Sequence, residues 1–180
     1  EYIRPAVTPN RRDMAKNATF DITSRIDLQE VDNAVNQARK EVNQRYDFKG
    51  ATAEIEFDKA AGTLTLTADD DYRMKSLVDV LETKLVKRGV PIRNLDYGPL
   101  TPASGGKVRR VVKLQQGIST EKGKEIVKEI KNGGFKKVQA QIQEDQVRVQ
   151  SPSIDELQAV IKYLKGKDFG IELQFGNFRS

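Results

Sequence analysis

Apolar residues follow two spacings along this chain, and the order in which the two spacings occur is repeated. An apolar residue at every second position is typical of a half-buried strand, whereas apolar residues spaced by three and four are typical of a helix with one buried face. Residues 20–97 give strand, helix, two strands, helix and strand, and residues 108–178 give the same order. The pattern predicts a duplicated β-α-β-β-α-β unit.

In the first copy, residues 20–26 (FDITSRI) alternate between apolar and polar and predict a strand. Asp27 and Glu30 have the spacing of a capping box at the start of the next helix. Two alternating strands flank a turn at 59–62, and the acidic residues 69–71 begin a second helix, where carboxylates suit the positive end of the helix dipole.

The second copy follows the same logic with different residues. A strand is predicted at 108–116, Ser119 caps a helix, and alternation at 138–143 begins a second hairpin. A second capping box at 153–156 starts the last helix, and residues 172–178 form the closing strand. We therefore expect an α+β protein with two ferredoxin-like units, each a four-stranded antiparallel sheet with both helices on one face.

The chain of 180 residues divides at its Pro-, Gly- and Ser-rich stretch. Residues 1–18 show no periodicity and are expected to be a flexible arm. Met14-Ala15-Lys16 would make a plausible native start, so we expect that residues 1–13 are not part of the natural protein. The expected boundaries of the arm, the first unit, the linker and the second unit are residues 1–18, 19–98, 99–106 and 107–180.

Composition narrows the function. The chain has no His and no Cys, so it lacks the usual general base, thiol nucleophile and soft metal ligands, and we expect neither an enzyme nor a bound metal or cofactor. No apolar run is long enough for a membrane span, and we expect a cytoplasmic protein that does not contact a membrane. The formal net charge is +5, and the positive excess lies in residues 107–180.

Strand periodicity predicts which side chains face away from the helices. The first hairpin is expected to present acidic and hydroxyl side chains, from Glu54, Glu56, Asp58, Thr63, Thr65 and Thr67. The second is expected to present long amides and one cation, from Gln139, Gln141, Gln143, Gln146, Arg148 and Gln150. Amides and guanidinium groups can read base edges and contact phosphates, although such a row also suits a strand face that only meets water. No outward position carries an aromatic side chain, so base stacking on the middle of the sheet is not expected.

Several blocks of the chain resemble the YajQ family of bacterial proteins, in order and over residues 18–179. The stretches that carry the resemblance are FDITSRIDLQEVDNAV from Phe20, RYDFKG from Arg45, KLVKRG from Lys84, QGI from Gln116, KKVQAQIQ from Lys136, DELQAVI from Asp155 and LQFGNFR from Leu173. The resemblance implies two RNP-like domains that exchange their first strands, so that residues 20–26 would join the second sheet and residues 108–116 the first. It also implies nucleotide binding, with RNA and cyclic di-GMP as ligands.

We therefore predict a non-catalytic nucleotide- or RNA-binding protein that uses its open sheet faces. The residues expected to bind are Arg25, Gln139, Gln141, Gln143 and Arg148 on one sheet, Arg109, Arg110 and Lys113 at the other, and Arg179 at the closing strand. The alternative is an interaction or regulatory module whose open sheets dock a protein partner or a second copy. A hydrolase that uses carboxylates is a third hypothesis, with no positive support in the sequence.

Overall fold

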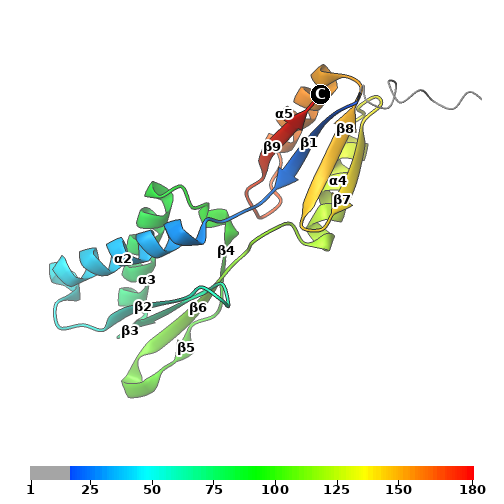
Figure 1. The fold of residues 1–180 in the computed structure, drawn as a ribbon. Coiled ribbons are helices and arrows are strands. Elements are labelled where there is room, and N and C mark those ends of the chain that lie inside the picture. The colour runs from blue at the N-terminus through cyan, green and yellow to red at the C-terminus, as the bar shows by residue number, and fades with distance from the viewer. Residues whose placement is uncertain (1–16) are drawn as a thin grey trace, which may run out of the picture. The chain divides into compact units, whose positions relative to one another are not determined.

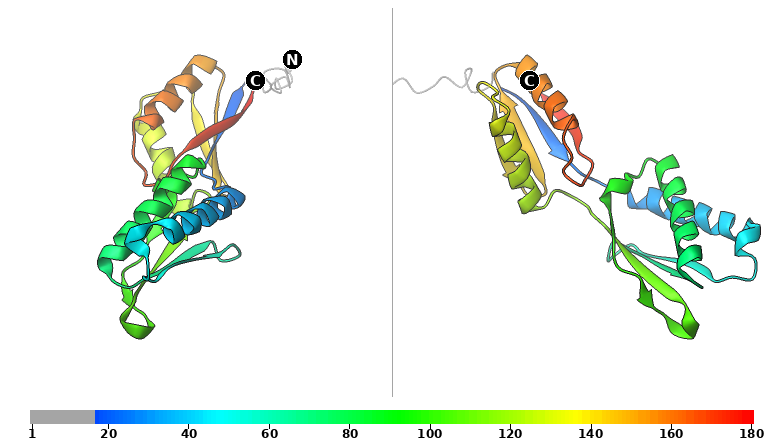
Figure 2. Two further views of the ribbon diagram at one scale, coloured as in Figure 1. Left: turned by 90° about the vertical axis from the view of Figure 1, so that its left-hand side faces the viewer. Right: turned by 180° about the vertical axis from the view of Figure 1, so that it is seen from behind.

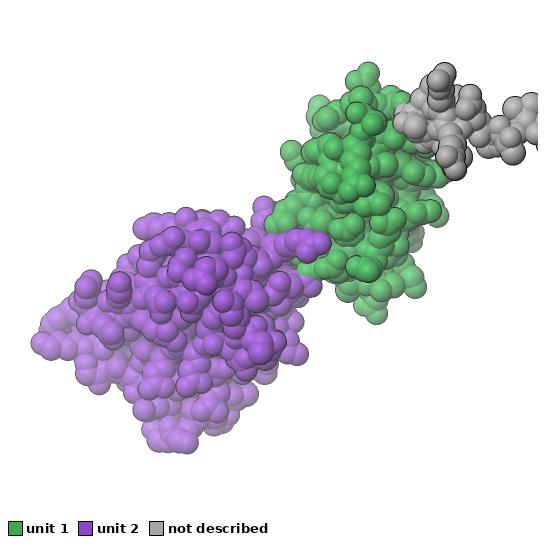
Figure 3. All heavy atoms as spheres, in the orientation of Figure 1, with its two compact units in different colours: residues 1–24, 117–169, 173–180 green, residues 25–116, 170–172 purple. Residues whose placement is uncertain are grey.

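The computed structural model describes residues 17–180, and the expected arm and native start lie outside them, apart from residues 17 and 18. The chain forms two compact units, which Figure 3 shows in different colours. Unit 1 contains the described part of residues 1–24 with 117–169 and 173–180, and unit 2 contains 25–116 with 170–172. The two units are described separately below.

Unit 2 is a sheet with two helices on one face (Figure 1). Helices α2 (Leu28–Gln44) and α3 (Asp71–Lys87) pack on strands ordered β2-β3-β6-β4. The strands are β2 (Ala53–Asp58), β3 (Thr63–Ala68), β6 (Val108–Leu114) and β4 (Leu95–Tyr97), and the short β5 (Thr101–Pro102) also pairs with β6. Three 3-10 turns complete the unit, at Tyr46–Phe48 (η1), Ile92–Asn94 (η2) and Ser104–Gly106 (η3).

Unit 1 has the same layout on a smaller sheet, and Figure 2 shows each sheet with its helices on one side. Its strands are ordered β7-β8-β1-β9, with bounds β7 (Gln139–Gln143), β8 (Gln146–Ser151), β1 (Ala18–Thr23) and β9 (Gln174–Arg179). Its helices are α4 (Thr120–Asn132) and α5 (Ile154–Lys165). The predicted fold class, α+β with two ferredoxin-like units, is confirmed.

The two sheets exchange strands between the two halves of the sequence. Strand β1 lies between β8 and β9, antiparallel to both, although it precedes α2 in the chain. Strand β6 lies between β3 and β4 in the other sheet, although it precedes α4. Each sheet therefore takes a central strand from the half of the chain that supplies the helices of the other unit, as the resemblance implied.

Local sequence accounts for the helix starts and for the core. Side chains of Asp27, Asp70, Ser119 and Ser153 accept hydrogen bonds from backbone N–H groups in the first turns of the four helices. Alternating strand residues such as Leu64, Leu66 and Val112 are fully buried under α2 and α3. The faces of the sheets away from the helices are left without a covering layer of secondary structure (Figure 2).

The stretch expected as a linker, residues 99–106, lies within unit 2. It contains β5 and η3 and turns the chain from β4 back into β6, with Ala103 N–H donating to the carbonyl of Lys107 at 2.8 Å. The chain instead passes between the units at Ser24–Arg25 and Gln116–Gly117, and residues 170–172 return briefly to unit 2 before β9. None of the helices within residues 17–180 has both the length and the apolar character needed to cross a membrane.

Candidate nucleotide-binding face

The open face of the unit 1 sheet carries mainly amide side chains. Alternate residues of each strand point to this face, and the strand register aligns them in rows that cross the sheet. The outward positions are Gln139, Gln141 and Gln143 on β7, Gln146, Arg148 and Gln150 on β8, Thr19, Asp21 and Thr23 on β1, and Gln174, Gly176 and Arg179 on β9. The predicted outward orientation of the second hairpin is confirmed, because Gln141 is exposed and Arg148 is half-buried instead of lying under a helix.

An ion pair occupies the centre of this face. Arg148 Nε donates to Asp21 Oδ1 at 2.8 Å, and its Nη2 donates to Oδ2 at 3.3 Å. Asp21 is 4% exposed. The hydrogen bond from Arg148 lowers the pKa of Asp21 despite the opposing effect of burial, and the same bond raises the pKa of Arg148. The guanidinium is therefore fixed in orientation and stays charged, with its charge balanced locally by Asp21.

A bulge in β9 adds a second donor to Asp21. Asp21 faces Gly176 and Thr19 faces Arg179, so three steps along β9 match two along β1. Asn177 lies in the bulge with a φ of 54°, a left-handed conformation that Asn tolerates better than most residues. Its amide donates to Asp21 Oδ2 at 2.6 Å. The bulge also sets Arg179 at the end of the same face.

The amides contact one another along the rows. Gln150 Nε2 donates to Gln139 Oε1 at 2.7 Å, and Thr23 Oγ1 donates to Gln174 Oε1 at 3.4 Å. Gln141 on the outer strand is exposed, so its amide presents both a donor and an acceptor to solvent. The face can therefore offer both hydrogen-bond donors and acceptors to a flat polar ligand.

The open face of the unit 2 sheet has a different character. Its rows run from the carboxylates of β2 across the threonines of β3 to Arg109, Val111 and Lys113 on β6. A pocket of about 580 Å³ lies over these rows and extends to Ser104 and Lys107 of the β5–β6 connection. The predicted acidic and hydroxyl face is confirmed, and the exchanged strand adds cations to one side of it.

The structure separates the three cations predicted on β6. Arg109 and Lys113 face outward with the threonines, whereas Arg110 has the parity of Val112 and lies on the helix side. Its guanidinium carbon lies 6.0 Å from the ring centroid of Tyr97, whose hydroxyl donates to Glu82. Burial raises the pKa of Tyr97, and the bond to Glu82 adds to that effect. Arg110 is thus part of the contact between sheet and α3, apart from the open face.

The other predicted binding residues divide between the units. Gln139, Gln141, Gln143, Arg148 and Arg179 share the open face of unit 1. Arg25 lies beyond the end of β1, in the first segment of unit 2, and is not part of a strand. The unit 1 face therefore brings together five of the nine residues predicted to bind ligand, and Arg25 is not among them.

Two polar residues of this face were missed by sequence reasoning. Asp21 was counted only as a polar position in an alternating strand, and Asn177 as part of a closing strand. The signal for Asp21 was a carboxylate at an outward position of a strand that the exchange would make central, where a buried acid needs a cationic partner. Nothing in the sequence marks the bulge at Asn177 beyond a Gly-Asn pair inside a strand.

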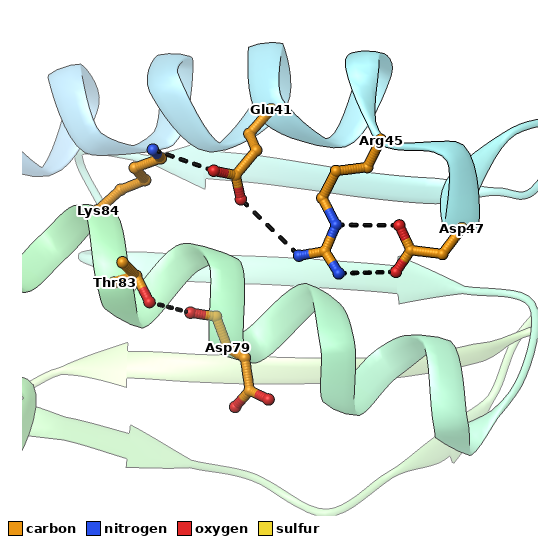
Figure 4. Close-up of polar contacts among 6 residues, drawn as sticks. All are labelled: Glu41, Arg45, Asp47, Asp79, Thr83 and Lys84. Carbon is orange, nitrogen blue, oxygen red and sulfur yellow. Dashed lines mark hydrogen bonds and ion pairs between the residues drawn. The ribbon is translucent and has the colours of Figure 1, made fainter.

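The RYDFKG stretch forms a rigid turn at the end of α2 in unit 2. Figure 4 shows Arg45 between Glu41 and Asp47, with paired bonds of 2.9 and 2.7 Å to Asp47 and a contact of 3.8 Å to Glu41. Glu41 also contacts Lys84 of α3 at 3.2 Å. The network fixes the turn that buries Phe48. The network also joins α2 to α3, so it stabilises the helix layer of unit 2.

Two α+β units with exchanged strands and polar open faces define a tandem ferredoxin-like protein, and residues 17–180 contain no cluster of His, Cys, Asp and Glu suited to a metal ion. The chain belongs to the family described as nucleotide-binding protein YajQ-like, whose model matches residues 18–179.

Curated relatives match this chain over nearly their whole length. A protein named nucleotide-binding protein from Trichlorobacter lovleyi is 57% identical over 161 residues, which cover 89% of this chain and 98% of that protein. Proteins of the same name from Carboxydothermus hydrogenoformans and Syntrophotalea carbinolica are 54% and 57% identical, covering 92% and 90% of this chain and 100% and 99% of theirs.

Proposed function

We propose that this protein binds nucleotides or RNA without catalysing a reaction, through the open face of the unit 1 sheet. The observation that carries the proposal is the central guanidinium of Arg148, fixed by Asp21 and surrounded by outward-facing amides on an uncovered sheet. A flat surface of fixed donors and acceptors suits the edges of bases and the hydroxyls of ribose.

The two arginines of this face are proposed to have different roles, because a carboxylate balances the charge of only one of them directly. Because Asp21 balances the charge of Arg148, that guanidinium serves mainly as an oriented hydrogen-bond donor. Arg179 lies at the exposed end of the face, and its charge helps to lower the pKa of Asp21. Because Asp21 is already paired with Arg148, Arg179 is the cation that we propose for contact with a phosphate. The names of the curated relatives, which call them nucleotide-binding proteins, support the same class of ligand.

Direct binding tests the proposal. We expect the fluorescence anisotropy of a fluorescein-labelled single-stranded RNA to increase when the full chain is added. The binding should weaken as the salt concentration rises. Gln141→Ala removes exposed hydrogen-bonding groups and is expected to weaken binding several-fold, and Arg179→Gln to weaken it and to flatten the salt dependence. Gln44→Ala and Arg93→Ala, exposed positions in unit 2, serve as matched controls and should bind as the parent does. An absence of binding to RNA and to mononucleotides at low salt would refute the function.

A second function is favoured by the unit 2 face. Its pocket sets the carboxylates of Glu54 and Glu56 against Lys107 and Arg109, and Val111 is exposed within it. Mixed charge with an apolar centre suits a polar protein partner better than a polyanion. Recovery of one protein in stoichiometric amount, insensitive to nuclease and lost in Val111→Asp, would support an interaction module; recovery that nuclease abolishes would favour the nucleic-acid function.

A further inference from the structure

An apolar pocket of about 220 Å³ lies at the end of the unit 1 sheet, where β9 ends and α5 begins. Its apolar wall comes from one aromatic and three aliphatic residues, Phe178, Ile154, Leu157 and Ala18. Its polar rim includes Thr19, Gln158 and Arg179. Thr19 and Arg179 are paired across β1 and β9 on the open face, so the pocket continues directly from the candidate binding face.

More than half of the surface of two apolar residues in this wall is exposed. Phe178 is 59% exposed and Ile154 is 57% exposed. The ring of Phe178 is nevertheless held in place, because its centroid lies 5.9 Å from that of the fully buried Phe20. A fixed ring with an uncovered surface is suited to stacking, since little side-chain entropy remains to be lost on binding.

The bulge in β9 decides which side of the sheet this ring takes. In a regular strand, residue 178 would share the outward side with residues 174 and 176, and the extra residue at Asn177 shifts that register by one. The shift leaves Arg179 outward beside Thr19 and turns Phe178 to the helix side, where it contacts Phe20 and lines the pocket with Ile154 and Leu157 of α5. Neighbouring residues of β9 therefore supply an aromatic ring to the wall of the pocket and a cation to its rim, where the rim meets the open face.

We propose that this pocket is a base-stacking site, in which one unpaired nucleobase lies against Phe178 while Arg179 contacts the adjoining phosphate. The inference rests on the proposed function and specifies how part of the ligand is held. Every nucleobase has an apolar face and a charged backbone beside it, and an exposed ring next to an arginine matches that combination. The amide rows then contact neighbouring nucleotides, so the ligand class is a single-stranded oligonucleotide whose bases are free to stack.

Substitutions at Phe178 test the site. Phe178→Leu keeps an apolar side chain over Phe20 and removes the aromatic face, whereas Phe178→Ala removes most of the wall. We expect Phe178→Leu to weaken binding of a labelled single-stranded oligoadenylate by about tenfold, in the range typical of one stacked base, and Phe178→Tyr to restore it. Tyr46→Leu, at a ring 88% exposed in unit 2, is the matched control and should leave binding unchanged.

The outcomes separate the stacking site from the proposed function. If Phe178→Leu binds as the parent does while Gln141→Ala weakens binding, the function stands and the stacking site is refuted. If neither oligonucleotides nor nucleotides bind, the proposed function and the stacking site are both refuted. A change from dimer to monomer in Phe178→Leu by sedimentation, or nuclear Overhauser contacts from Phe178 to residues 1–16, would assign the pocket to a second copy or to this chain's own N-terminal segment and would also overturn the inference.

Discussion

At the scale of single residues, the centre of the unit 1 face depends on one carboxylate. Asp21 is nearly buried in a central strand and accepts hydrogen bonds from both Arg148 and Asn177. A buried carboxylate without donors would be costly, so the two donors are needed for Asp21 to remain ionised. In return Asp21 fixes the orientation of the guanidinium through two hydrogen bonds, so a residue that contacts no ligand in the proposed site sets the geometry of one that does.

Replacing this carboxylate should reveal a dependence on pH. The folded protein lowers the pKa of Asp21 below its ordinary value of 3.8, chiefly through the bond from Arg148. The stabilisation is therefore complete above the unfolded-state value and is lost as the pH falls through the lower folded-state value. We expect Asp21→Asn to reduce the free energy of unfolding by about 1–3 kcal/mol at pH 7 in urea titrations.

The difference between Asp21→Asn and the parent should shrink as the pH falls below about 4, because the parent then becomes protonated at the same site. Asp96→Asn, an exposed carboxylate on the unit 2 sheet, is the control and should change stability by less than about 0.5 kcal/mol. A loss that stays constant down to pH 2.5 would show that charge at Asp21 is not its source.

At the scale of secondary-structure elements, the chain carries clear local signals for where helices begin. Asp27 Oδ1 accepts from the backbone N–H groups of Gln29 and Glu30 at 3.0 and 3.4 Å, as the capping position predicted. Helix α2 then buries Val31, Ala34 and Val35 against the unit 2 sheet. The cap therefore sets where α2 begins, shortly after the chain enters unit 2 at Arg25.

Removal of the α2 cap should lower stability without affecting the proposed site. We expect Asp27→Ala to destabilise the protein by about 1 kcal/mol, since two backbone donors lose their acceptor and the positive helix end loses a carboxylate. Asp27→Asn retains the acceptor and should recover most of the loss. Thermal unfolding followed by circular dichroism measures both, and equal losses in the two variants would argue that charge alone, not capping, is responsible.

The same scale shows what local sequence predicts well and what it does not. A period of two fixes the face on which each strand residue lies, so the outward glutamines and the carboxylates of β2 were predictable. The placement of Arg110 under α3 follows from the same parity, but only after its neighbours Val108 and Val112 are recognised as the buried set. The bulge at Asn177 has no periodic signal, so alternation alone could not predict that Arg179 faces outward and Phe178 lies on the helix side.

At the scale of the whole molecule, periodicity gives two repeats but not their pairing. Each repeat contains all six elements of a ferredoxin-like unit, so local patterns are equally consistent with two sheets that use their own first strands. The exchange of β1 and β6 was implied only by the family resemblance, because strand partners are non-local and no alternation identifies them. The exchange decides the function proposed here, since it brings Asp21 to Arg148.

The exchange of strands also predicts how fragments of the chain fold, alone and together. Fragment 17–98 lacks β6, the strand between β3 and β4, and fragment 107–180 lacks β1, the strand between β8 and β9. Each fragment would carry its own first strand, but Phe20 of β1 would lose its place in the unit 1 core, and the outward pair of Asp21 with Arg148 would not form. We expect that neither fragment alone unfolds cooperatively in urea. We expect an equimolar mixture to recover slow amide exchange in β1, β3, β6 and β8, because mutual strand donation restores both sheets.

A mixture of fragment 17–98 with a 107–180 fragment carrying Val112→Asp is the control, in which a charge in the unit 2 core should prevent recovery. Cooperative unfolding of fragment 17–98 by itself would show that β1 can replace β6, and that the exchange is a choice between two nearly equal pairings instead of a requirement of the sequence.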